Sequence, residues 1–96
     1  MINSMRVEVD PRISILAGYE YGREIWNTQC SLDDVNINEN YYLVLPAQIE
    51  GMASNFVNGF FQEIIEKIGA EKAAERLCIN NKELEEDVKA SILLNA

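Results

Sequence analysis

The sequence predicts an α/β fold: a small, mostly parallel four-stranded sheet with helices packed on it. Apolar and polar residues alternate near the N-terminus, a continuous apolar run at residues 41–45 ends at Pro46, and apolar residues recur every three or four positions in residues 54–68. Alternation with a period of two is typical of strands, and the longer spacing is typical of helices. Because strands and helices then alternate along the chain, we expect most strands to be parallel.

The first two strands are expected to form a hairpin. Residues 5–10 and 12–16 both alternate, and Asp10-Pro11 between them favours a turn. Residues 19–30 follow with the pattern of an amphipathic helix that places Trp26 in the core. Gly22 costs this helix about 1 kcal/mol relative to alanine, so it marks either close packing against another element or a later start of the helix.

The third strand is the apolar run at residues 41–45. A short apolar run with turn signals at both ends is typical of a strand buried on both faces. Pro46 ends the strand because it has no N–H to donate to a neighbour.

The longest predicted helix covers residues 54–68. Ser54 or Asn55 can cap its start, and Gly69 stands where a left-handed residue would end it. Residues 70–76 offer two more helical turns.

A fourth strand at residues 77–79 precedes the final helix. Asn80, followed three residues later by Glu83, resembles a capping box for that helix. The predicted order is ββαβαβα in one domain that spans residues 1–96.

The charge balance limits the classes of partner. Sixteen acidic and eight basic residues give a net charge of −8. Such a surface repels phosphates, so nucleic acid and anionic membranes are disfavoured, whereas a basic protein surface is compatible.

The residue types present argue against catalysis. The chain has no histidine, so no Ser-His-Asp or Cys-His arrangement and no imidazole ligand can form. We therefore predict no enzymatic activity, no cofactor and no metal site. The acidic residues of the last helix are interpreted as a solvated face: Glu83, Glu85, Glu86 and Asp87.

The two cysteines and the start of the chain indicate the compartment. Cys30 and Cys78 are predicted to be buried small side chains in a reducing environment. No apolar leader and no run long enough to span a membrane is evident. We expect a cytoplasmic protein.

One loop differs from the rest of the chain. Residues 48–56 lie between the carboxyl end of the third strand and the start of the longest helix, where open α/β sheets usually bind ligands and partners. A phosphate on Ser54 would be stabilised by the helix dipole. The alternative is that Ser54 only caps the helix. The predicted partner-binding residues are Glu50, Gly51, Met52, Ser54 and Asn55.

Two segments resemble a bacterial and phage family of small STAS-like domains, whose members resemble anti-anti-sigma factors. They are Gly-Arg-Glu-Ile at residues 22–25 and Ile-Glu-Gly-Met-Ala-Ser-Asn-Phe-Val-Asn-Gly-Phe-Phe at residues 49–61, and the resemblance extends over residues 13–94. It implies a STAS-like fold and a role in binding another protein, such as a kinase or a sigma-type regulator. In the better-known relatives a serine in this loop is phosphorylated to break a complex, and Ser54 matches that serine.

Two hypotheses of function follow. The first is a regulatory protein–protein interaction module that docks through residues 50–56. The alternative is an acidic phage-encoded or accessory inhibitor that blocks a basic surface of a host protein. A homodimer is compatible with either.

Overall fold

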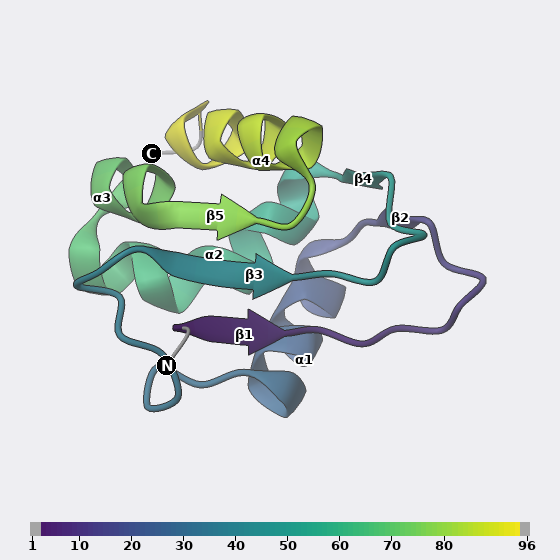
Figure 1. Cartoon of the computed structure of the whole chain (residues 1–96), viewed down its shortest axis with the longest axis horizontal. Coiled ribbons are helices and arrows are strands. Elements are labelled where there is room, and N and C mark those ends of the chain that lie inside the picture. The colour runs from purple at the N-terminus through teal and green to yellow at the C-terminus, as the bar shows by residue number, and fades with distance from the viewer. Residues whose placement is uncertain (1–2, 95–96) are drawn as a thin grey trace.

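The computed structural model describes residues 3–94, which form an α/β fold (Figure 1). The elements run β1 (Ser4–Arg6), β2 (Ile15–Leu16), α1 (Tyr19–Gln29), β3 (Tyr41–Val44), β4 (Gly51–Met52), α2 (Ser54–Ile68), α3 (Ala70–Arg76), β5 (Leu77–Ile79) and α4 (Lys82–Leu94). The α/β class is confirmed, and the helices begin and end within one or two residues of the predicted positions. The first three predicted strands are shorter in the structure, the strand at residues 77–79 is confirmed, and β4 is an additional one.

The predicted four-stranded sheet is wrong. The strands form a three-stranded sheet in the order β1-β3-β5 and a separate two-stranded sheet of β2 and β4. Every pairing between these strands is parallel.

The predicted hairpin between the first two strands is also wrong. Asp10 does make a turn, because its carboxylate accepts the backbone N–H of Arg12 at 2.8 Å and its carbonyl accepts that of Ile13 at 2.9 Å. The chain on either side has no regular strand pairing, although Val9 and Ile13 pack partly against the core. The alternating residues before and after the turn therefore belong to irregular chain that packs on the core. The strands β1 and β2 pair with β3 and β4, not with each other.

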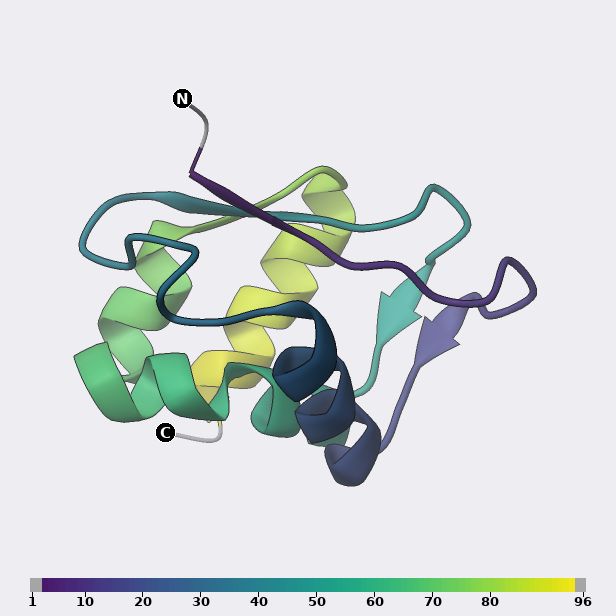
Figure 2. The same ribbon diagram turned by 90° about the horizontal axis from the view of Figure 1, so that it is seen from below.

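Strand β3 is buried on only one face, contrary to the prediction. Tyr41 and Leu43 are fully buried, whereas the Tyr42 side chain between them is 45% exposed. Figure 2 shows the reason: the helices lie on one side of β1 and β3, and no helix or strand of residues 3–94 lies on the other side. The hydroxyl of Tyr41 donates to the Ala73 carbonyl at 2.6 Å, which ties the sheet to α3.

Two glycines let α1 and α2 pack closely. Close packing at Gly22 was one of the predictions from the sequence, and the structure confirms it. A methyl group on Gly22 would lie 2.5 Å from the Phe56 carbonyl oxygen, and one on Gly59 would overlap the Tyr19 carbonyl. Such contacts leave no room for a Cβ, so the backbones of the two helices touch at this crossing.

The buried side chains form one apolar cluster between the sheet and the helices. Its largest members are aromatic: Trp26 and Phe60 meet edge to face with their ring centroids 5.4 Å apart, and Phe60 meets Phe61 in the same way at 4.9 Å. The placement of Trp26 in the core is confirmed, since it is 2% exposed.

The end of α2 follows the prediction, and the start of α4 departs from it. Gly69 follows α2 with φ of 85°, a left-handed value. The predicted cap by Asn80 is wrong by one residue: Asn81 accepts the backbone N–H of Leu84 at 3.1 Å. The Asn80 side chain instead bonds both backbone groups of Leu45, at 2.9 Å each.

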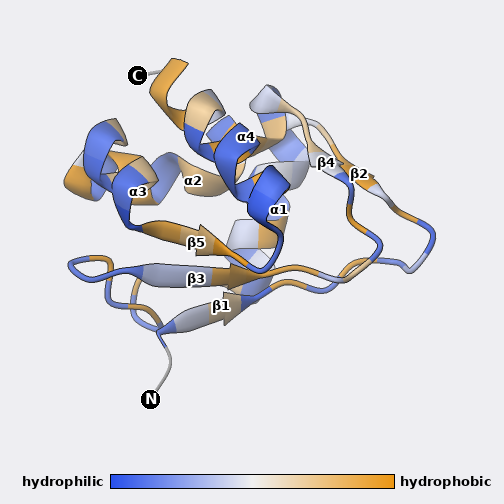
Figure 3. Cartoon of the chain, turned by 45° about the horizontal axis from the view of Figure 1, so that its top comes forward, coloured by the Kyte–Doolittle hydropathy of each residue, from blue (hydrophilic) through white to orange (hydrophobic). Residues whose placement is uncertain are grey.

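The acidic start of α4 is mostly solvated, as predicted, with one exception. Figure 3 shows hydrophilic first turns and a hydrophobic end of this helix. Glu85, however, is only 8% exposed, and its carboxylate accepts the backbone N–H of Ile79 at 2.8 Å. Lys82 and Lys89 lie 3.6 and 3.8 Å from its other oxygen. Glu85 thus ties the start of α4 to the end of β5.

Candidate functional site

The predicted binding loop is held against β2. Within it, Gly51 pairs with Ile15 and Met52 with Leu16 in a short parallel ladder. On either side of the ladder, the backbone N–H of Glu50 donates to the Ser14 carbonyl at 2.7 Å, and that of Ala53 donates to the Leu16 carbonyl at 2.8 Å. The loop is therefore a fixed surface whose neighbour is the segment that leads into α1.

Ser54 is exposed and is the first residue of α2, but it does not cap the helix. The residue in the cap position is Ala53, and no side chain bonds there. The first turn of α2 also contains no acidic residue. The serine hydroxyl therefore lies at the positive end of the helix dipole with no carboxylate of that turn beside it.

Asn55 connects the loop to α1. Its side-chain oxygen accepts the backbone N–H of Gly18 at 3.0 Å and that of Phe56 at 2.8 Å. The predicted capping role is therefore replaced by a bridge between the start of α2 and the residue just before α1.

Two exposed apolar side chains were missed by the sequence analysis: Ile15 lies against this loop, and Tyr19 lies along α2 just beyond it. Ile15 is 54% exposed and faces Gly51, where its Cδ1 lies 3.1 Å from the position of a Cβ. Tyr19 is 41% exposed, follows Gly18 directly, and its hydroxyl bonds the side chain of Gln62. The signal for Ile15 was present in the sequence, because adjacent residues of a strand point to opposite faces and Leu16 takes the inner one.

We call this surface the docking patch. It consists of Ile15, Tyr19 and the loop at residues 50–55. Glu50 is exposed within it, and Glu20 is exposed beside it; neither carboxylate forms an ion pair within residues 3–94. The patch therefore combines apolar side chains with unpaired negative charge.

The crevice at the carboxyl ends of β3 and β5 is a different place from the docking patch. It has a volume of about 230 Å³. Residues that follow the two strands line it, including Pro46 after β3 and Asn80 after β5, whereas Ser54 does not. Ile49 of the predicted loop therefore lines the crevice at the strand ends, whereas the predicted partner-binding residues at 50–55 do not. The chain continues from β3 past this crevice and reaches the second sheet before it enters α2.

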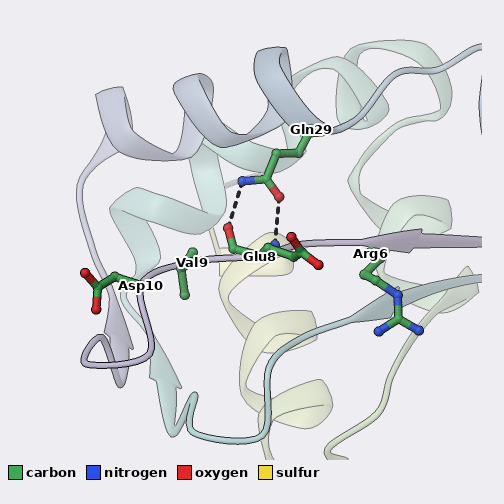
Figure 4. Close-up of a pocket in the computed structure, with 5 residues that line it drawn as sticks. All are labelled: Arg6, Glu8, Val9, Asp10 and Gln29. Carbon is green, nitrogen blue, oxygen red and sulfur yellow. Dashed lines mark hydrogen bonds between the residues drawn. The ribbon is translucent and has the colours of Figure 1, made fainter.

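A second depression lies where the chain leaves β1 and passes the end of α1 (Figure 4). Gln29, at the end of α1, accepts the backbone N–H of Glu8 at 2.7 Å and donates to its carbonyl at 2.8 Å. Arg6 and Asp10 lie at opposite ends of the depression in the figure. The glutamine therefore fixes the chain just after β1 to the end of α1, and the surrounding side chains do not converge on one point.

Both cysteines are free thiols. They were predicted to be buried, but each is only partly buried. Cys30 packs partly against the core, and its burial, with the nearby Asp34 carboxylate, raises the pKa of its thiol to about 11. Cys78, in the middle of β5, lies on the uncovered side of the sheet between the inward-facing Leu77 and Ile79.

Within residues 3–94, no three side chains of the metal-binding types are grouped so that they could hold an ion. None of the helices in the same range has the length and apolar character needed to cross a membrane.

Comparison with known proteins returned no significant match among protein-family models, curated proteins or solved structures. The resemblance to the STAS-like family therefore stays a prediction that rests on residues 22–25 and 49–61.

Proposed function

We propose that the chain is a regulatory protein–protein interaction module that docks through the docking patch. The observation that carries the proposal is the position of Ile15 and Tyr19. Large apolar side chains that stay exposed next to a fixed polar loop are typical of a surface that a partner covers. The proposed activity is binding and not catalysis.

The arrangement of backbone groups supports the same surface. The loop is fixed by hydrogen bonds to Ser14, Leu16 and Gly18, so it is already ordered before a partner arrives. A preformed surface loses less conformational entropy on binding than a mobile loop does. Tyr19 is the natural anchor, since tyrosine is enriched among the residues that dominate binding energy.

Affinity capture from the cell that naturally makes the protein tests the proposal. The wild-type chain is compared with Ile15→Ser/Tyr19→Ser and with a control, Leu93→Ser, which removes an exposed apolar side chain from α4. We expect a specific partner to be recovered by the wild type and the control and lost from the double variant. Recovery of the same proteins by all three chains, or of no specific protein by any, would contradict the proposal.

We further propose that phosphorylation of Ser54 regulates this docking. Ser54 is exposed, lies inside the docking patch, and is followed by a turn of α2 without acidic residues. A phosphate there would be stabilised by the helix dipole and would change the charge at the centre of the surface.

The alternative function, an acidic inhibitor of a basic host surface, is favoured by the net charge of −8 and by the unpaired Glu20 and Glu50. Ionic strength separates the two. Binding that depends on exposed charges weakens steeply as salt is added, whereas binding anchored by Ile15 and Tyr19 does not. A steep salt dependence, together with full binding by the Ile15→Ser/Tyr19→Ser variant, would favour the inhibitor.

A further inference from the structure

The uncovered face of the three-stranded sheet has no physical explanation within a single copy of the chain. Parallel sheets occur almost only where both faces are covered. Here the inward residues of β1, β3 and β5 are buried, and the helices lie on that side alone (Figure 2). The side chains on the other face are Ser4, Arg6, Tyr42, Val44 and Cys78.

The composition of this face differs from the rest of the surface. The chain has sixteen acidic residues, yet none of these five outward residues is acidic. At the centre, Tyr42 is 45% exposed, with Val44 and Cys78 half-buried beside it. Two acidic molecules repel each other least where they meet through a face without carboxylates.

Charge is nevertheless present at the two ends of the face, and its signs are opposite. A shallow groove of about 750 Å³ runs past Tyr42, with Arg6 and Glu39 both in its lining. Arg6 pairs in register with Val44 near the end of β3, whereas Glu39 precedes β3. Both side chains are exposed, and neither forms an ion pair within residues 3–94.

We infer that this sheet face is a homodimer interface, in which two copies pack face to face around Tyr42. A two-fold axis that lies across the strands reverses their direction in the second copy. The Arg6 end of each copy then lies over the Glu39 end of the other, so one contact supplies two opposite-charge pairs. The inference is independent of the docking patch, which lies on β2, β4 and the helix starts.

The interface is small. Its strands contribute three or four residues each, whereas a stable interface buries about 800 Å² on each partner. We therefore expect a reversible dimer, populated at high protein concentration.

Sedimentation equilibrium over a concentration series measures this dimer directly. The wild type is expected to shift from monomer to dimer as its concentration rises to the millimolar range. Tyr42→Asp is expected to weaken the dimer by about tenfold or more, because it places like charges in the centre of the contact. Tyr42 is exposed, so the variant should fold, and circular dichroism checks this.

A charge exchange identifies the contact. Arg6→Glu and Glu39→Arg should each weaken the dimer by about tenfold, because each replaces attraction with repulsion at two places. The double variant restores opposite signs and should recover most of the affinity. Glu86→Arg, an exposed change on α4 with the same change in charge as Glu39→Arg, is the matched control.

Three results would overturn the inference: a wild-type chain that is monomeric at millimolar concentration, a dimer that Tyr42→Asp leaves intact, or a double charge variant as weak as the single ones. Failure here is separable from failure of the docking proposal. Tyr42→Asp should still capture the partner that Ile15→Ser/Tyr19→Ser loses.

Discussion

At the scale of single residues, the contact between α1 and α2 depends on two missing methyl groups. Gly22 and Gly59 face the backbone of the opposite helix, with the Phe56 and Tyr19 carbonyls in the space that a Cβ would take. Backbone atoms cannot rotate aside as a flexible side chain can. A larger residue must therefore push the two helices apart, and Tyr19 at the docking patch would move with them.

Gly59→Ala is expected to lower the free energy of unfolding by about 3 kcal/mol, near the upper end of the cost of overpacking a core. Urea denaturation followed by circular dichroism measures the change. Glu66→Ala, an exposed change on the same helix, is the control and should shift stability by no more than about 0.5 kcal/mol. Equal stability of the two variants would show that α1 and α2 do not pack backbone to backbone.

The Cys30 thiol should be less reactive than an ordinary cysteine thiol. Burial and Asp34 raise the pKa of Cys30 from an ordinary value of 9.0 to about 11. The thiolate is the reactive form, so at any pH well below 9 Cys30 carries about a hundredfold less of it than an unshifted thiol.

We therefore expect iodoacetamide at neutral pH to label Cys30 much more slowly than it labels a short unstructured cysteine peptide, with mass spectrometry as the measurement. The labelling rate of Cys30 should keep rising with pH until about 11. Labelling of Cys30 that is as fast as that of the peptide, or that levels off near pH 9, would contradict the environment described for it.

At the scale of elements, α2 is the helix whose start matters most, and its start is polar without being capped by a side chain. The 15-residue helix gives Ser54 a strong local dipole, while Asn55 is already occupied by Gly18 and Phe56. A charge added at Ser54 therefore acts on the helix end and on the docking patch together.

Ser54→Glu, which imitates the phosphoserine charge, should stabilise the fold by about 0.5 kcal/mol through the helix dipole and should reduce capture of the partner. Ser54→Ala is the matched control and should retain capture. If both variants bind as the wild type does, and peptide mass spectrometry finds Ser54 always unmodified in the native cell, the proposed switch is wrong.

The helices could be predicted from the sequence better than the strand pairings could. The helices could be predicted because their signals are local: apolar spacing in residues 54–68 and a glycine at position 69. The pairing of β1 with β3 could not, because alternation in a strand says which face is buried but not which strand lies beside it. A loop before α2 could be predicted from the sequence, but its connection to Gly18 through Asn55 depends on tertiary contacts.

At the scale of the whole molecule, the chain has two surfaces of different character. All helices lie on one side of the β1-β3-β5 sheet, and the docking patch lies beyond the end of that sheet, where β2 and β4 meet the starts of α1 and α2 (Figures 1 and 2). The uncovered sheet face is free of carboxylates on its strands, whereas the docking patch includes the exposed Glu50. The two proposals divide along this difference: a second copy would meet the sheet face, and a different protein would meet the docking patch.

The most direct test of the docking proposal is site-specific photo-crosslinking in the native cell. A photoreactive amino acid is placed at Glu50 in the docking patch, at Tyr42 on the sheet face, or at Glu86 on α4; all three positions are exposed, so the fold tolerates the substitution. We predict that Glu50 alone gives an adduct with a different protein. An adduct with the same protein from Glu86 but none from Glu50 would contradict the account.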